Sequence, residues 1–323
     1  MNKGIYILAS NGVLNSLVAL LNSIESNYSS EIPICIIPYN DQMDLIEKEI
    51  QKRKNVFLFD DPKSIGRWEA FFQKLHQLYL AYPYENLTQK KTLVLNMYRK
   101  CCAFDGPFDR FLYIDCDTLV FQPLDYLFEK LDEYDCVSHD FQRLTSIRKN
   151  EVSRFYQIFK DDYLSEAELA TQFHCGGFWG YDKGKITSDD LDDFYQDMVK
   201  GDMKIFAQDF FDDTPVLNYM NLKKGLKLYN VTVDKASEYN TGSCVTSRHF
   251  EERNQIMYDR GKKLTYLHYM GIKSTSLNRL SWWKKNQLPC QEKLFKIADK
   301  LFDWQLTRIP YKTTFLHYRF LSD

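Results

Sequence analysis

Hydrophobic and polar residues alternate in blocks along the first 60 positions of the chain. Short apolar runs at 4–10, 32–41 and 55–60 are bounded by polar residues and indicate buried strands. Between them, apolar residues recur at helical spacing over 14–24 and 44–53. The order strand, helix, strand, helix, strand predicts an α/β fold with a doubly wound, mostly parallel sheet of the Rossmann-like type.

A fourth strand is predicted at 110–115, after a segment (68–104) that reads as helical and is rich in aromatic residues. Asp115 ends this strand and Asp117 follows it, within the run "FLYIDCDTLV". Ligands of such sheets bind beyond the carboxyl ends of the strands, which is where this pair lies. Two neighbouring carboxylates repel each other beside apolar residues, so a divalent cation between them is one interpretation. A strand-end turn with two solvated aspartates is the other.

The composition narrows the class of protein. The chain carries 42 Lys and Arg against 44 Asp and Glu, which argues against a general nucleic-acid binder. Its eight cysteines contain no CxxC pair, a pattern that suits a reducing cytosol better than a disulfide framework. The N-terminal segment lacks the unbroken apolar run of a signal peptide, and no stretch reaches the roughly 18 apolar residues of a membrane span. We therefore expect a cytoplasmic protein.

The C-terminal segment is basic and aromatic. Residues 273–323 contain 10 Lys and Arg against 4 Asp and Glu, and Trp282 and Trp283 precede Lys284 and Lys285. This pattern fits a helix packed on the domain with a solvated lysine face. It also fits weak contact with an anionic membrane surface, which would make the protein a peripheral membrane protein. The segment also carries Phe295, Leu301, Phe302 and Trp304.

The run "FLYIDCDTLVFQPLDYLF" (111–128) resembles the DxD segment of GT-A glycosyltransferases, most closely family 8, the group of glycogenin and bacterial lipooligosaccharide galactosyltransferases. Further segments resemble that family's motifs in the same order: "NMYRK" (96–100), "HCGGFWGY" (174–181), "DDTPVLNYM" (212–220) and "LHYMGIK" (267–273). The resemblance covers about residues 4–273. The chain departs from the family where Ser274, Thr275 and Ser276 replace Lys-Pro-Trp, and where Cys175 and Thr214 replace asparagine and glutamine.

The resemblance implies a metal site formed by Asp115, Asp117 and His268. Two carboxylates, one imidazole and the oxygens of a diphosphate complete an octahedral site for Mn²⁺ or Mg²⁺, and the imidazole favours Mn²⁺. Taken alone, His268 follows the apolar run "LTYL", which is as consistent with a buried core histidine as with a metal ligand.

The resemblance also implies which residues contact the nucleotide sugar. Asp213 and Asn218 would face the donor sugar at the reaction centre, while Arg99 and Lys273 would hold sugar or phosphates. The full set of expected nucleotide-sugar contacts is Ala9, Asn11, Asp41, Arg99, Asp115, Cys116, Gly176, Gly177, Gly271 and Lys273. Plainer readings remain open: a solvated acidic loop for Asp213, a helix cap for Asp41, a surface position for Arg99, and a strand bulge for the glycine pair.

We therefore expect a metal-dependent glycosyltransferase, a hexosyltransferase that moves a sugar from a nucleoside-diphosphate sugar to an acceptor with retention of configuration. UDP is the favoured donor nucleotide, and the acceptor is an unidentified glycan, lipid-linked molecule, protein or small molecule. The expected organisation is a GT-A catalytic domain over 1–275 and a C-terminal helical extension over 276–323. Within the domain, the nucleotide-binding half spans about 1–120 and the acceptor half about 121–275.

Two rival functions remain open at the level of sequence. A haloacid-dehalogenase-like phosphatase would use Asp115 and Asp117 in its nucleophile motif, although Leu119 stands where that motif has threonine or valine. A non-catalytic sugar-nucleotide-binding protein would retain the donor site but not the chemistry.

Overall fold

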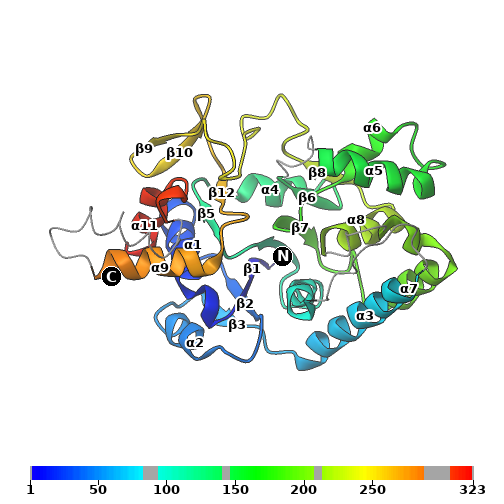
Figure 1. Ribbon diagram of the computed structural model, residues 1–323, viewed down its shortest axis with the longest axis horizontal. Coiled ribbons are helices and arrows are strands. Elements are labelled where there is room, and N and C mark those ends of the chain that lie inside the picture. The colour runs from blue at the N-terminus through cyan, green and yellow to red at the C-terminus, as the bar shows by residue number, and fades with distance from the viewer. Residues whose placement is uncertain (1, 83–93, 140–145, 207–212, 287–305, 322–323) are drawn as a thin grey trace.

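A seven-stranded sheet forms the centre of the protein in the computed structural model, which describes residues 2–82, 94–139, 146–206, 213–286 and 306–321 (Figure 1). The order across the sheet is β3-β2-β1-β4-β7-β6-β8. The strands are β1 (Lys3–Ala9), β2 (Ile34–Pro38), β3 (Val56–Leu58), β4 (Arg110–Ile114), β6 (Cys136–Ser138), β7 (Phe178–Asp182) and β8 (Leu228–Asn230).

The first four strands run parallel, and β7 runs antiparallel to both of its neighbours. The chain moves from β1 to β2 and β3 on one side, and then places β4 on the other side of β1. Such a reversal of strand order opens a crevice at the carboxyl ends of the two central strands. The predicted α/β fold with a mostly parallel sheet is confirmed.

Alternate residues of each strand separate the core into two layers. On β1, Tyr6 and Leu8 face a cluster that includes the helix α3 (Pro62–Ala81). Ile5 and Ile7 face the opposite cluster, with α1 (Leu14–Asn27) and α4 (Asp125–Lys130). Because side chains alternate along a strand, Phe111 and Tyr113 of β4 also face the α3 side of the sheet.

The described part of the segment predicted as helical over 68–104 is only partly α-helical. The prediction is right for α3, but Leu95–Phe104 forms a 3₁₀-helix, η2. A 3₁₀-helix has three residues per turn, so side chains three apart lie above one another. Met97 and Lys100 therefore share one side of η2, and both line the same cleft.

One carboxylate joins η2 to α3. Asp105, directly after η2, accepts hydrogen bonds through Oδ2 from Ser64 Oγ at 2.6 Å, Arg67 Nη2 at 2.9 Å and Trp68 Nε1 at 2.9 Å. Trp68 is fully buried. This contact fixes the C-terminal end of the segment that carries Lys100.

A second layer packs against α1 on the side away from α3. The short pair β5 (Thr118–Val120) and β12 (Tyr266–His268) is antiparallel, and a separate ribbon comprises β9 (Glu251–Arg253), β10 (Ile256–Asp259) and β11 (Lys262–Lys263). The C-terminal helices α9 (Ser274–Lys285) and α11 (Lys312–Arg319) lie beside α1 in Figure 1. Leu277 and Phe315 belong to the hydrophobic cluster beneath them.

The remaining helices flank the sheet: α2 (Asp44–Ile50), α5 (Ser146–Phe159), α6 (Glu166–Leu169), α7 (Asp190–Lys200) and α8 (Asp213–Lys223). The expected boundary at 275/276 falls inside the first turn of α9, and the division into domains stays a prediction. Phe295, Leu301, Phe302 and Trp304 lie outside the described residues. Across the described part of the chain, no helix is both long and apolar enough to cross a membrane.

Replacing Asp105 by alanine should lower the free energy of unfolding by about 2–3 kcal/mol, because the buried indole N–H of Trp68 loses its acceptor. Urea denaturation measures this change. Asp132→Ala, which removes a carboxylate that is 70% exposed beside Arg110, should change stability by less than about 1 kcal/mol. Equal effects of the two replacements would contradict the role given to Asp105.

Candidate active site

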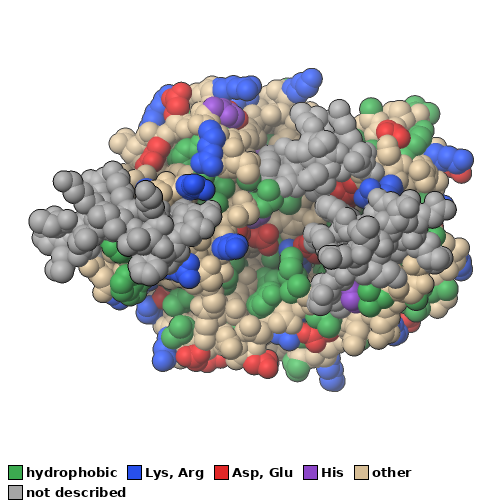
Figure 2. Space-filling view, viewed as in Figure 1, with side chains coloured by type: hydrophobic (Ala, Val, Ile, Leu, Met, Phe, Trp, Pro, Cys, Tyr) green, Lys and Arg blue, Asp and Glu red, His purple; other side chains and the backbone are tan. Residues whose placement is uncertain are grey.

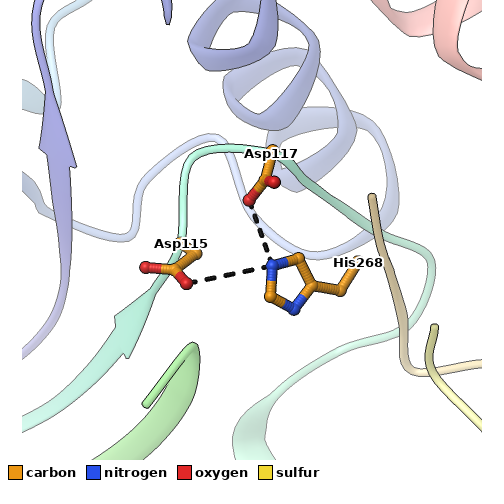
Figure 3. A group of neighbouring side chains, drawn as sticks. All are labelled: Asp115, Asp117 and His268. Carbon is orange, nitrogen blue, oxygen red and sulfur yellow. Dashed lines mark ion pairs between the residues drawn. The ribbon is translucent and has the colours of Figure 1, made fainter. Parts of the chain in front are cut away.

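Two distant segments of the chain bring Asp115, Asp117 and His268 together (Figure 3). His268 pairs with Thr118 in the β5–β12 ladder, and Tyr269 N donates to Asp117 O at 2.8 Å. His268 Nε2 lies 3.1 Å from Asp117 Oδ1 and 3.8 Å from Asp115 Oδ2. One candidate ligand atom from each residue lies within 4.8 Å of the others. The pairing of two three-residue strands therefore creates the cluster.

The charges of this cluster shift the pKa values of His268 and Asp117. Burial alone would lower the pKa of His268, but Asp117 and Asp115 outweigh it and raise the pKa above the ordinary value. Burial alone would raise the pKa of Asp117, but His268 beside it lowers the pKa. A proton on His268 thus balances the carboxylates. A metal ligand must be a neutral imidazole, so a proton and a cation compete for this site.

Two glycines allow the side chains to approach so closely. A Cβ atom at Gly177 would lie 2.8 Å from both Asp115 Oδ2 and His268 Cε1. A Cβ atom at Gly176 would lie 2.6 Å from Asp213 Oδ2. The glycine pair therefore separates two carboxylates, with Asp115 over one glycine and Asp213 over the other.

A buried lysine connects these carboxylates. Lys100 Nζ lies 2.5 Å from Asp213 Oδ2, 3.2 Å from the carbonyl oxygen of Gly176 and 3.5 Å from Asp115 Oδ1. Burial alone would lower the pKa of Lys100, but Asp115 and Asp213 raise it well above its ordinary value. Lys100 is only 4% exposed and is therefore a fixed positive charge between Asp115 and Asp213.

A cleft of about 520 Å³ lies over the carboxyl ends of the central strands. Figure 2 shows a hollow in the middle of the viewed face, with acidic and hydrophobic side chains visible in it. Among the predicted site residues, Ala9, Asp115, Cys116 and Asp117 line the cleft. The other described lining residues are Leu8, Ser10, Gly12, Val13, Ser16, Tyr39, Asn40, Gln42, Met97, Lys100, Tyr113, Ile272 and Ser274.

Several predicted contacts have other partners. Arg99 is not among the described lining residues: its Nε donates to Glu69 Oε1 at 2.6 Å and its Nη1 to the Pro38 carbonyl at 3.0 Å. Asn11 accepts a hydrogen bond from Leu45 N at 3.0 Å, so its side chain caps the neighbouring helix α2.

Asp41 and Asn218 are also not among the described residues that line the cleft. Asp41 is exposed, and its neighbours Asn40 and Gln42 line the cleft instead. Asn218 is fully buried, with Oδ1 accepting from His174 N at 3.1 Å and Nδ2 donating to His174 O at 3.0 Å. These two hydrogen bonds to the backbone fix the segment that leads into the glycine pair.

The turn after β12 completes one end of the cleft. Gly271 has φ of +80°, which favours glycine, and Lys273 is exposed at the N-cap of α9. Ile272 and Ser274, on either side of Lys273, line the cleft. The loop at the end of the segment "LHYMGIK" (267–273) therefore borders the site. The roles given to Gly271 and Lys273 stay predictions.

Sequence reasoning missed Lys100, although it lies within the quoted motif "NMYRK". The three-residue turn of η2 aims Lys100 at the cleft and Arg99 at α3. Spacing that assumes an α-helix does not distinguish these two neighbours. The spacing of three between Met97 and Lys100 could have indicated that both residues face the cleft. It does so only if the segment is known to be a 3₁₀-helix, in which residues three apart lie on the same side.

The residues present fit a divalent cation of the Mn²⁺ or Mg²⁺ type. The side chains of Asp115 and Asp117 are 27% and 28% exposed, so their oxygens are accessible from the cleft, and His268 lies beneath them. Two carboxylates and one imidazole leave three positions of an octahedron open to a ligand in the cleft.

No protein-family model and no curated protein sequence matches the chain. Among solved structures, the galactosyltransferase LgtC in complex with donor and acceptor sugar analogs aligns with 90% of this chain and 99% of its own, at 14% identity and a TM-score of 0.53. An active-site mutant of LgtC aligns with 92% of this chain and 95% of its own, at 14% identity and a TM-score of 0.50. Mouse xyloside xylosyltransferase 1, apo form, aligns with 71% of this chain and 85% of its own, at 9% identity and a TM-score of 0.47.

The two alignments with LgtC define the fold class. The chain has a mixed α/β architecture with a mostly parallel central sheet, as in the GT-A glycosyltransferases. The alignment with LgtC spans nearly the whole of both chains, so the shared architecture includes the sheet and the elements that follow it.

Gly177→Ala should weaken Mn²⁺ binding by about tenfold or more, because the new methyl group displaces Asp115 Oδ2 or the ring of His268. Electron paramagnetic resonance of free Mn²⁺ measures the affinity. Gly66→Ala is the matched control: nothing lies within 4 Å of its Cβ atom, and within α3 it should stabilise the fold by about 0.5–1 kcal/mol. Unchanged Mn²⁺ affinity in Gly177→Ala would contradict the close approach seen here.

In the metal-free protein, protonated His268 should stabilise the fold, because its pKa is raised above the value of about 6.5 in the unfolded chain. This contribution is complete below about pH 6.5 and is lost as the pH rises through the raised pKa. Urea denaturation in the presence of a chelator should show the fall. The variant His268→Gln should lack it, whereas Mn²⁺ affinity of the unaltered protein should rise over the same range. A pH-independent Mn²⁺ affinity would be the contrary result.

Proposed function

We propose that the protein is a metal-dependent glycosyltransferase that transfers a sugar from a nucleoside-diphosphate sugar to an acceptor. One observation carries this proposal: Asp115, Asp117 and His268 converge at the edge of a cleft at the carboxyl ends of β1 and β4. The similarity of the fold to GT-A glycosyltransferases, which include the family 8 group, supports the same interpretation. UDP is the donor nucleotide we propose, and retention of configuration is the proposed stereochemistry.

The proposed mechanism divides the work between two ends of the site. Asp115, Asp117 and His268 would hold the cation, which supplies charge neutralisation for the departing diphosphate. At the other end, Lys100 holds Asp213 in a fixed orientation through the 2.5 Å contact. Asp213 is the carboxylate that would stabilise positive charge developing on the donor sugar, as carboxylates do in glycoside chemistry.

The glycine pair also shapes the backbone beside the candidate site. Gly176 and Gly177 let the backbone before β7 lie directly against the carboxylates, and Thr214 Oγ1 accepts from Gly176 N at 3.0 Å. The ammonium group of Lys100 occupies the space between Asp115 and Asp213.

The two rival functions have less support. The solved structures that align with about 90% of the chain are of a galactosyltransferase, not of a phosphatase of the haloacid-dehalogenase type. A non-catalytic binding protein has no need for the buried Lys100–Asp213 pair beside the cation site. Hydrolysis of UDP-, GDP- and TDP-sugars in Mn²⁺, set against hydrolysis of p-nitrophenyl phosphate, separates the three functions.

Asp117→Asn should abolish turnover of the sugar nucleotide, because an amide does not replace the charge of a carboxylate ligand. The rate of nucleoside-diphosphate release with Mn²⁺ measures this. Asp109→Asn changes a carboxylate at the other end of β4 and should leave the rate within about twofold. Near-normal rates in Asp117→Asn would rule out the metal role.

Lys100→Met should lower turnover by about 100-fold or more, because Asp213 and Asp115 lose the ammonium group that lies between them. Arg99→Met should instead reduce the free energy of unfolding by about 1–3 kcal/mol, through loss of its bonds to Glu69 and Pro38. Its turnover should stay within about tenfold of normal. If Arg99→Met instead lowers turnover more than Lys100→Met does, the prediction from sequence that Arg99 contacts the nucleotide sugar would be supported.

A further inference from the structure

The two oxygens of Asp115 have different surroundings. Oδ1 accepts a hydrogen bond from Tyr113 Oη at 2.7 Å and lies 3.5 Å from Lys100 Nζ. Oδ2 lies on the other side, 3.8 Å from His268 Nε2 and above Gly177. The carboxylate is therefore already oriented, with one oxygen facing protein donors and the other facing the candidate cation site.

The position of Tyr113 is fixed by the sheet and the core. Tyr113 precedes Asp115 by two residues at the end of β4, so both side chains lie on the same side of the sheet. Its ring stacks on Trp179 at 4.9 Å between centroids, and Trp179 Nε1 donates to Gly176 O at 3.0 Å. Tyr113 is fully buried. The hydroxyl group thus has one placement, which lies against Asp115 Oδ1.

We propose that Tyr113 is a positioning residue that makes Asp115 a one-oxygen ligand, and that it thereby sets the preference of the site for small, six-coordinate cations over Ca²⁺. This inference rests on the metal site of the proposed function. The hydroxyl proton occupies Oδ1, and the ammonium group of Lys100 near the same oxygen repels a second positive charge. Only Oδ2 remains for a cation.

Coordination number turns this orientation into selectivity. Mg²⁺ requires a near-ideal octahedron at short distances, which one oxygen from each carboxylate and one imidazole nitrogen allow. Ca²⁺ takes about six to eight oxygen ligands and often binds a carboxylate through both oxygens. A carboxylate that offers one oxygen withholds the additional ligand, so it disfavours Ca²⁺ relative to Mg²⁺ and Mn²⁺.

The experiment compares three ions in matched variants. Mn²⁺ binding is followed by electron paramagnetic resonance of the free ion, and Mg²⁺ and Ca²⁺ are titrated as competitors. Tyr113→Phe should lower Mn²⁺ and Mg²⁺ affinity by about tenfold and Ca²⁺ affinity by less, so that the ratio of Ca²⁺ to Mg²⁺ affinity rises by about threefold or more. Loss of folded protein alone reduces binding of all three ions alike and does not change this ratio.

Tyr181→Phe is the matched control. Tyr181 is also fully buried in the same aromatic cluster, but its hydroxyl donates to Asn221 Oδ1 at 2.8 Å, away from Asp115. This replacement should leave all three affinities within about twofold.

Three results would overturn the inference. An unchanged ratio in Tyr113→Phe would show that the hydroxyl does not set selectivity, although the proposed glycosyltransferase function would stand. A ratio that changes equally in Tyr181→Phe would assign the effect to the core. If the unaltered protein binds none of the three ions, the metal site itself is wrong, and sugar-nucleotide turnover in the presence of a chelator then tests the remaining function.

Discussion

The antiparallel pairing of β5 with β12 is the interaction on which the site depends. It joins residues about 150 positions apart in sequence through three register pairs, and one of these pairs contains His268. The backbone bond from Tyr269 N to Asp117 O fixes the turn that holds the aspartates against the same ladder. Without this pairing, His268 would not lie beside the two strand-end carboxylates.

The buried charges form a balanced chain that starts from that ladder. His268 faces Asp117, Asp115 lies between His268 and Lys100, and Lys100 contacts Asp213. Each group is at least partly desolvated, so each needs an opposite charge within a few ångströms. The candidate cation site and Asp213 are thus parts of one network, and the glycine pair sets the spacing between its two ends.

Much of the architecture could be predicted from sequence, because strands and helices follow hydrophobic periodicity. The strands of the first half, the carboxyl-end position of Asp115 and Asp117, and the overall α/β class appear in the structure as expected. The side-chain assignments were less accessible. Lys100, rather than the predicted Arg99, points into the site because η2 is a 3₁₀-helix, and Asn11 caps α2 because β1 and β2 are neighbours. Both outcomes depend on tertiary placement, which single-residue patterns do not encode.

The fixed charges around the cleft bear on the order in which ligands enter. Lys100 lies between Asp115 and Asp213, and Asp117 lies beside His268. These groups together carry one net negative charge when His268 is protonated and two when it is neutral. A diphosphate that approaches this arrangement alone meets like charge across a partly desolvated gap. A dication that arrives beforehand cancels the excess and converts repulsion into attraction. Under the proposed function, these charges therefore favour binding of the cation before the nucleotide.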